Sequence, residues 1–182
     1  MTRLLCVAMA AMCMVPSTAL AQEGSVSRAV KEIFDRYSKN MVDASKVMPA
    51  DKYSFRPTSE QWTFGEIVAH VVFANFNVCS IVSDNPRPEE ARISDTAPKD
   101  TMVESLQASA DFCEKVLPKL QDSRLEDTVI FFGGRQTPRA RAAIELAIDV
   151  VDHYAQMAMY LRLNGLEPPL PRPIIPRGAA GR

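Results

Sequence analysis

The chain has 182 residues, of which 21 are Lys or Arg and 22 are Asp or Glu, giving a formal net charge of −1. This balance argues against nucleic acid or an anionic membrane as the main partner, because both select strongly basic surfaces. The length is enough for one domain with a sizeable core, and the sequence contains no internal repeat.

Residues 1–21 have the pattern of a secretory signal peptide. Arg3 supplies the positive start, residues 4–15 are almost wholly apolar, and Ala19-Leu20-Ala21 has the small-x-small form of a cleavage site. We expect cleavage before Gln22 and a soluble protein in the periplasm or the medium, without stable membrane insertion; an uncleaved anchor is the alternative. Cleavage removes only Arg3 among the charged residues, leaving 20 of the 21 basic residues against all 22 acidic ones.

The cysteines divide between the two parts of the chain. Cys6 and Cys13 leave with the signal, so Cys79 and Cys113 are the pair that enters an oxidising compartment. Two cysteines are too few for a disulfide scaffold or for a cysteine-based zinc site. The sequence favours one Cys79–Cys113 disulfide over two separate buried thiols.

The first two predicted helices span residues 25–47 and 63–83. Both carry apolar residues at helical spacing, and Met48-Pro49-Ala50 ends the first. The second opens at Thr63, where Thr63-Phe64-Gly65-Glu66 has the form of a capping box. The threonine hydroxyl and the glutamate can each satisfy one free amide there.

A long polar loop over residues 84–99 precedes a third predicted helix at 101–120, which opens on a second capping box from Thr101 to Glu104. We interpret residues 127–136 as an apolar loop that packs onto the helices, because a strand without a partner makes no sheet. The fourth predicted helix spans residues 138–164, with a proline at its start and Gly165 at its end. Residues 167–182 form a proline-rich tail that we expect to be extended or disordered.

Four long helices with few strand signals predict an all-α protein with a four-helix bundle over residues 22–166. The long connection between the second and third helices allows a crossover instead of a strict up-and-down order.

The candidate chemistry centres on the only two histidines, His70 and His153. Each lies about 60° from the centre of the apolar stripe of its helix, and Asp149 lies one turn before His153. Two imidazoles and a carboxylate suit zinc, iron(II), nickel or manganese. The alternative is that Asp149 is an ordinary surface charge and His70 a hydrogen-bonded core residue.

Two segments resemble the DinB-like superfamily. Residues 149–169 are similar to its final helix, with Tyr-Leu-Arg-x-x-Gly at the end, and residues 52–57 and 62–70 are similar to its loop and second helix. The resemblance covers most of residues 25–169. It implies a four-helix bundle of up-down-down-up order with a three-histidine metal site, in a family that includes metal-dependent thiol transferases and isomerases.

The resemblance assigns His70 to the ligand on the second helix and His153 to the second ligand on the last helix. Asp149 stands where the family usually has its other histidine. Because aspartate also ligates zinc and iron, the site either survives with altered metal preference or has become an ordinary acidic position.

The sequence therefore supports two candidate functions. The first is an exported protein that binds one divalent metal ion and acts as a metal-dependent hydrolase or thiol transferase on a small molecule. The second is a non-catalytic periplasmic bundle with a degenerate metal site, which binds a small ligand or a protein. No Gly-x-Ser-x-Gly, P-loop or His-Glu-x-x-His motif supports another chemistry, and the sequence leaves the substrate and a homodimeric state open.

Overall fold

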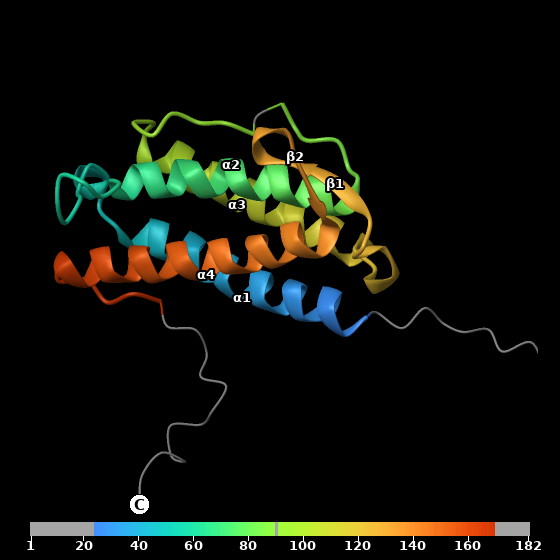
Figure 1. Cartoon of the computed structure of the whole chain (residues 1–182). Coiled ribbons are helices and arrows are strands. Elements are labelled where there is room, and N and C mark those ends of the chain that lie inside the picture. The colour runs from blue at the N-terminus through green and yellow to red at the C-terminus, as the bar shows by residue number, and fades with distance from the viewer. Residues whose placement is uncertain (1–23, 90, 170–182) are drawn as a thin grey trace, which may run out of the picture.

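The computed structural model describes residues 24–89 and 91–169. The predicted signal peptide and nearly all of the proline-rich tail lie outside these residues. The described part contains the helices α1 (Ser25–Val47), α2 (Phe64–Ser83), α3 (Lys99–Val116) and α4 (Arg139–Leu163), together with the hairpin strands β1 (Thr128–Phe131) and β2 (Arg135–Pro138) (Figure 1). Short 3-10 turns at 50–52, 117–119, 122–124 and 132–134 join these elements.

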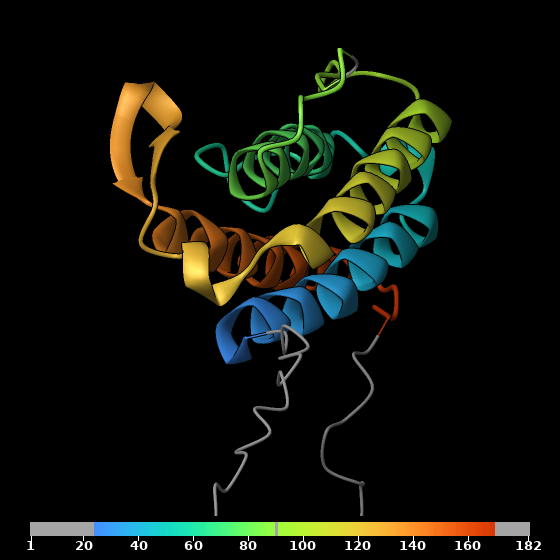
Figure 2. The same cartoon turned by 90° about the vertical axis from the view of Figure 1, so that its right-hand side faces the viewer.

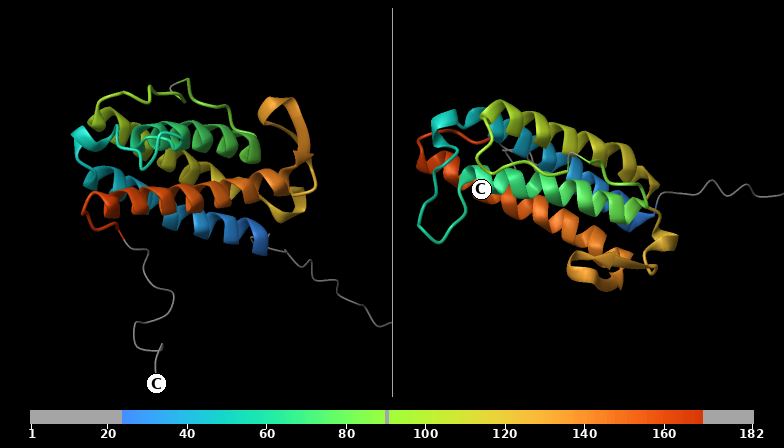
Figure 3. Two further views of the ribbon diagram at one scale, coloured as in Figure 1. Left: turned by 60° about the vertical axis from the view of Figure 1, so that its left-hand side comes forward. Right: turned by 90° about the horizontal axis from the view of Figure 1, so that it is seen from above.

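The four helices form a bundle in which α1 and α4 run in one direction and α2 and α3 in the other (Figures 1 and 3). Each helix packs mainly on its neighbours in the ring α1, α4, α2, α3. The loop after α2 returns along that helix, which lets α3 start at the same end of the bundle as α2. The predicted all-α class and the up-down-down-up order are confirmed.

Helix α2 is the most apolar of the four. By length and composition alone, Phe64–Ser83 is long enough to cross a membrane, with a mean hydropathy of 1.5 in its best window, and 67% of that window is buried inside the bundle. Burial against α3 and α4 accounts for this composition, since a core helix needs apolar residues over most of its circumference.

The capping signals predicted one helix start correctly and one wrongly. At α2, Thr63 Oγ1 accepts from the Glu66 amide at 3.1 Å and Glu66 accepts from the Thr63 amide at 2.6 Å, which confirms the first capping box. Helix α3 instead begins at Lys99, two residues before the predicted start, with Pro98 in extended conformation at its N-cap. Thr101 therefore lies inside the first turn, and no capping box forms there.

The far end of α3 also differs from the prediction. The helix ends at Val116 and a 3-10 turn, Leu117–Lys119, follows it. Pro118 lies in that turn, and its missing amide and its ring prevent continuation of the α-helical hydrogen bonds. The predicted end at residue 120 was therefore too late.

The predicted apolar loop after α3 is a β-hairpin, so that prediction was wrong. β1 pairs with β2 in antiparallel register from Thr128 opposite Pro138 to Phe131 opposite Arg135. The turn contains Gly133 at φ 70° and Gly134 at φ 75°, conformations that other residues rarely adopt. The hairpin lies beside α2 and α4, on the side away from α3 (Figure 2).

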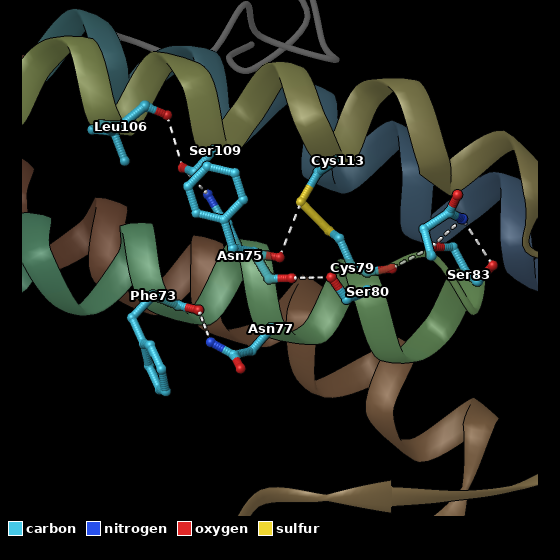
Figure 4. The surroundings of a disulfide bond; sticks show 11 residues. Phe73, Asn75, Asn77, Cys79, Ser80, Ser83, Leu106, Ser109 and Cys113 are labelled. Atoms are coloured by element: carbon cyan, nitrogen blue, oxygen red, sulfur yellow. Dashed lines mark hydrogen bonds between the residues drawn. A yellow bond between two sulfur atoms is a disulfide. The ribbon is translucent and has the colours of Figure 1, made fainter. Parts of the chain in front are cut away.

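A disulfide joins α2 and α3. Cys79 and Cys113 are bonded, with their Cα atoms 5.4 Å apart and both side chains fully buried (Figure 4). One turn away, Asn75 Nδ2 donates to Ser109 Oγ at 3.1 Å, so a polar contact between the same helices accompanies the covalent one. The two parallel helices are therefore fixed in register.

Candidate metal centre

Helices α2 and α4 bring His70, Asp149 and His153 together. His70 Nε2 lies 3.2 Å and His153 Nε2 3.4 Å from the same oxygen, Asp149 Oδ1. One ligand atom of each residue lies within 4.8 Å of those of the other two. Adjacent turns of α4 supply Asp149 and His153, and the packing of α2 against α4 adds His70.

The site lies at the edge of the bundle and is partly shielded from water. The side chain of His153 is 9% exposed, that of Asp149 25% and that of His70 33%. Burial favours the neutral form of Asp149, but hydrogen bonds from His153 and His70 outweigh it and lower the pKa of Asp149 to about 2. The carboxylate is therefore ionised at neutral pH, as a metal ligand must be.

The pKa of His153 is shifted in the opposite direction. Burial alone would lower it, whereas the hydrogen bond to Asp149 and the negative charge of that carboxylate raise the pKa above its ordinary value. A cation at this position, either a proton or a metal ion, is thus stabilised by Asp149.

One atom of the site has no partner. Asp149 Oδ2 is buried and forms no hydrogen bond with any described residue. A buried carboxylate oxygen without a partner carries a desolvation cost, so the site can accommodate a further cation beside Asp149. The two nitrogen–oxygen separations, 3.2 and 3.4 Å, also fit: two ligand atoms about 2.0–2.1 Å from a tetrahedral zinc ion lie roughly 3.3 Å from each other.

The second nitrogen of His153 is also oriented. His153 Nδ1 lies 3.4 Å from Gln156 Oε1, and Gln156 Nε2 donates to Asp152 Oδ2 at 2.8 Å. This chain of contacts favours the tautomer that carries its proton on Nδ1 and leaves Nε2 free to bind a metal. Such a partner behind a ligating histidine fixes the ring and increases its basicity.

A family model described as the DinB superfamily matches residues 33–157, more than half of the chain. The chain belongs to the DinB superfamily. This DinB-family protein matches no curated protein sequence.

Three solved structures show the same fold. The chain is similar to a protein described as a DinB family member from Exiguobacterium sibiricum, with 16% identity, a TM-score of 0.63, and coverage of 82% of this chain and 98% of that one. A DinB-like protein from Bacillus subtilis has 16% identity and a TM-score of 0.61, over 81% and 99% of the two chains. The mycothiol-dependent maleylpyruvate isomerase has 12% identity and a TM-score of 0.57 over 72% of this chain, which spans 60% of the enzyme.

Trp62 covers the site of this DinB-family protein. Its ring centroid lies 4.9 Å from that of His70 and 5.8 Å from that of His153, to which it is stacked at 18°. Trp62 could not be assigned to the site from the sequence, because it precedes α2 and belongs to no helical pattern. Its role could be inferred only from three-dimensional proximity.

The structure therefore brings together all three residues that the sequence singled out. It places the Cys79–Cys113 disulfide elsewhere, on the face of α2 that packs against α3. Glu66, one turn before His70, is held by its capping bonds to Thr63, and the bond that its carboxylate accepts from the Thr63 amide lowers the pKa of Glu66. A cleft of about 510 Å³ opens beside His70.

Proposed function

We propose that this protein binds one divalent metal ion through His70 Nε2, His153 Nε2 and the Asp149 carboxylate, and uses it in a reaction on a small molecule. The observation that carries the proposal is the convergence of both Nε2 atoms on one carboxylate whose second oxygen is buried without a partner. Three protein ligands are the number typical of catalytic sites, which keep a position for water or substrate.

A divalent ion in this site would act as a Lewis acid and lower the pKa of a bound water or thiol. The chain's own residues would do the rest. Asp149 supplies the negative charge, Gln156 orients His153, and Trp62 restricts the access of water to both imidazoles. Zinc, nickel, iron(II) and manganese all accept this ligand set.

The reaction we favour is hydrolysis, or transfer to or from a small thiol. The similarity to a thiol-dependent isomerase supports a thiol reaction as one candidate. The signal-like pattern of residues 1–21 leads us to propose that the protein works after export, in the periplasm or outside the cell.

The metal content of the purified protein tests the proposal. We expect about one equivalent of metal, or zinc uptake monitored by the fluorescence of Trp62, the only tryptophan in the chain. His153→Ala should abolish uptake, whereas Glu145→Gln should not, because Glu145 lies one turn before Asp149 and pairs with Arg141 instead. A folded wild-type protein that takes up none of the four metals would refute it.

A second candidate is a non-catalytic binding protein. It is favoured by one specific feature: when His153 is protonated, both histidines can donate an Nε2–H to Asp149 Oδ1, so this oxygen has two partners without a metal ion. Under this alternative the protein stays metal-free, and Asp149→Asn lowers thermal stability without affecting any metal-dependent property.

A further inference from the structure

The cleft beside His70 is formed by two different parts of the chain. Trp62, His70 and Phe73 line one side, and loop residues 92–95 line the other. His70 and Trp62 thus belong both to the cleft and to the proposed metal site. A molecule in the cleft would lie against His70, one of the proposed metal ligands, and against Trp62, which covers the site.

The loop that forms the far wall is fixed by packing. Ala91 is 2% exposed and Ile93 packs against the core, so the residue between them, Arg92, is directed outward. Further along, the Asp95 carbonyl comes so close to α2 that a Cβ atom on Gly65 would lie 2.6 Å from it. Only glycine at position 65 allows this approach, which holds the loop against α2.

Arg92 is the cationic group of this cleft. Its guanidinium carbon lies 3.9 Å from the ring centroid of Phe73, one turn beyond His70 on α2. This cation–π contact orients the guanidinium through its face, and the N–H donors at its edge stay available for a planar oxyanion. The arginine is therefore held in place before a ligand arrives.

The charge around Arg92 limits the ligand. Glu66 and Asp95 also line the cleft, and both are acidic. These two groups repel a dianion such as a phosphate ester more strongly than a monocarboxylate, whose single charge one arginine can pair. The exposed face of Trp62 offers a surface for an apolar body.

We infer that this cleft binds a small organic monocarboxylate with an apolar body, and that Arg92 is the positioning residue that holds its carboxylate. The inference rests on the proposed function only in so far as the metal would act on the other end of that molecule. Arg92 does not belong to the proposed metal ligands, so the carboxylate cleft and the metal function can fail independently of each other.

Benzoate, with benzamide as its uncharged isostere, is a suitable probe pair. We expect benzoate to change the fluorescence of Trp62 in the zinc-treated protein and to bind more tightly than benzamide. Arg92→Gln should weaken benzoate binding by about tenfold and leave benzamide binding unchanged. Arg92→Lys should restore part of the lost benzoate affinity. Arg87→Gln is the matched control, because Arg87 lies on the same loop but bonds Asn77 outside the cleft.

Zinc titration of the same variants separates the two proposals. Zinc affinity should be equal in the wild type, Arg92→Gln and Arg87→Gln. If the wild type binds no zinc but benzoate binding still depends on Arg92, the proposed metal function fails and the carboxylate cleft stands. The inference is overturned if benzoate does not bind, if benzamide binds equally well, or if Arg92→Gln leaves benzoate affinity unchanged.

Discussion

Tyr160 Oη donates a hydrogen bond to the backbone carbonyl of Trp62 at 2.8 Å, across 98 positions of the sequence. Tyr160 is 2% exposed, and burial raises its pKa, so its hydroxyl keeps its proton at neutral pH. The bond ties the segment before α2 to the end of α4. It therefore places the tryptophan that covers both histidines.

Tyr160→Phe removes this bond and little else. We expect a loss of about 1 kcal/mol in the free energy of unfolding and a greater solvent exposure of Trp62, seen as a red shift of its emission. Tyr154→Phe is the control, because that ring contacts Tyr37 and lies away from Trp62. Unchanged emission in Tyr160→Phe would show that the bond does not hold Trp62.

The ligand set predicts an order of metal affinities. Asp149→His should bind zinc or nickel more tightly than the wild type, because imidazole suits both ions and restores the histidine that the family resemblance implies at this position. Asp149→Ala should bind more weakly but stay folded, and His153→Ala should lose binding. Calorimetric titration with zinc and nickel measures the order. Equal affinity of Asp149→Ala and the wild type would remove Asp149 from the ligand set.

Zinc affinity should increase with pH. Binding needs the neutral imidazole of His153, and the Asp149 carboxylate raises the pKa of that ring, so protons compete at higher pH than at an exposed histidine. We expect a gain of up to about tenfold per pH unit between about pH 6 and 8. Titrations at several pH values check this, and an affinity independent of pH would contradict it.

The same pKa shift has the opposite effect on the metal-free protein. Because the folded state holds the His153 proton more tightly than the unfolded chain, the stabilisation is complete below about pH 6.5 and is lost as pH rises through the folded pKa. The lowered pKa of Asp149 acts at acid pH: its stabilisation is present above about pH 4 and is lost as pH falls toward 2. Melting curves of the metal-free protein should therefore show a melting temperature that falls as pH rises through the folded pKa of His153, and that falls again as pH drops below about 4.

The metal candidates could be predicted because they depend on helical spacing. Asp149 and His153 share a face of one helix at i, i+4, and His70 lies on a helix whose start is marked by a capping box. Helical spacing and the family resemblance were therefore enough to select these three residues. Trp62 and Arg92 could not be predicted in this way. Both belong to segments outside regular helices, and only the packing of loop 84–98 along α2 reveals their proximity.

The hairpin was missed for a related reason. Val129 and Phe131 alternate with exposed residues in β1, but the partner strand Arg135–Pro138 is polar and carries no strand pattern. Gly133-Gly134 was the usable signal, because two consecutive glycines favour a turn in which φ is positive. The strand conformation of β2 is therefore determined by its pairing with β1 more than by its own residues.

Arg139 stabilises the junction between α2 and α4. Its side chain is 4% exposed and donates to the carbonyls of Ile81 and Val82 at 3.0 and 2.9 Å, and to Asp84 at 3.1 Å. Arg139→Met should lower the free energy of unfolding by about 2–4 kcal/mol, because these carbonyls at the end of α2 lose their donor.

Arg124→Met is the matched control for Arg139. Arg124 also pairs with Asp84, at 2.7 Å, but its side chain is 47% exposed. Exposed pairs contribute little to stability, so the difference in unfolding free energy between the two variants measures the effect of burial rather than of charge. Equal losses in urea unfolding would show that the surface network around Asp84, and not the buried donor, holds this junction.

The Cys79–Cys113 disulfide should dominate the response to reduction. The bond closes a loop over a sequence separation of 34, which in the chain-entropy model stabilises the folded state by about 3–4 kcal/mol. Thiol titration of the unfolded, unreduced protein should detect no free thiol at these positions, and a reductant or the double variant Cys79→Ser, Cys113→Ser should lower the melting temperature. Because both sulfurs are buried and His70 lies more than two turns from Cys79 along α2, the variant should keep the zinc affinity of the wild type. A loss of zinc binding in the folded variant would show that the register of α2 against α3 also determines the geometry of the metal centre.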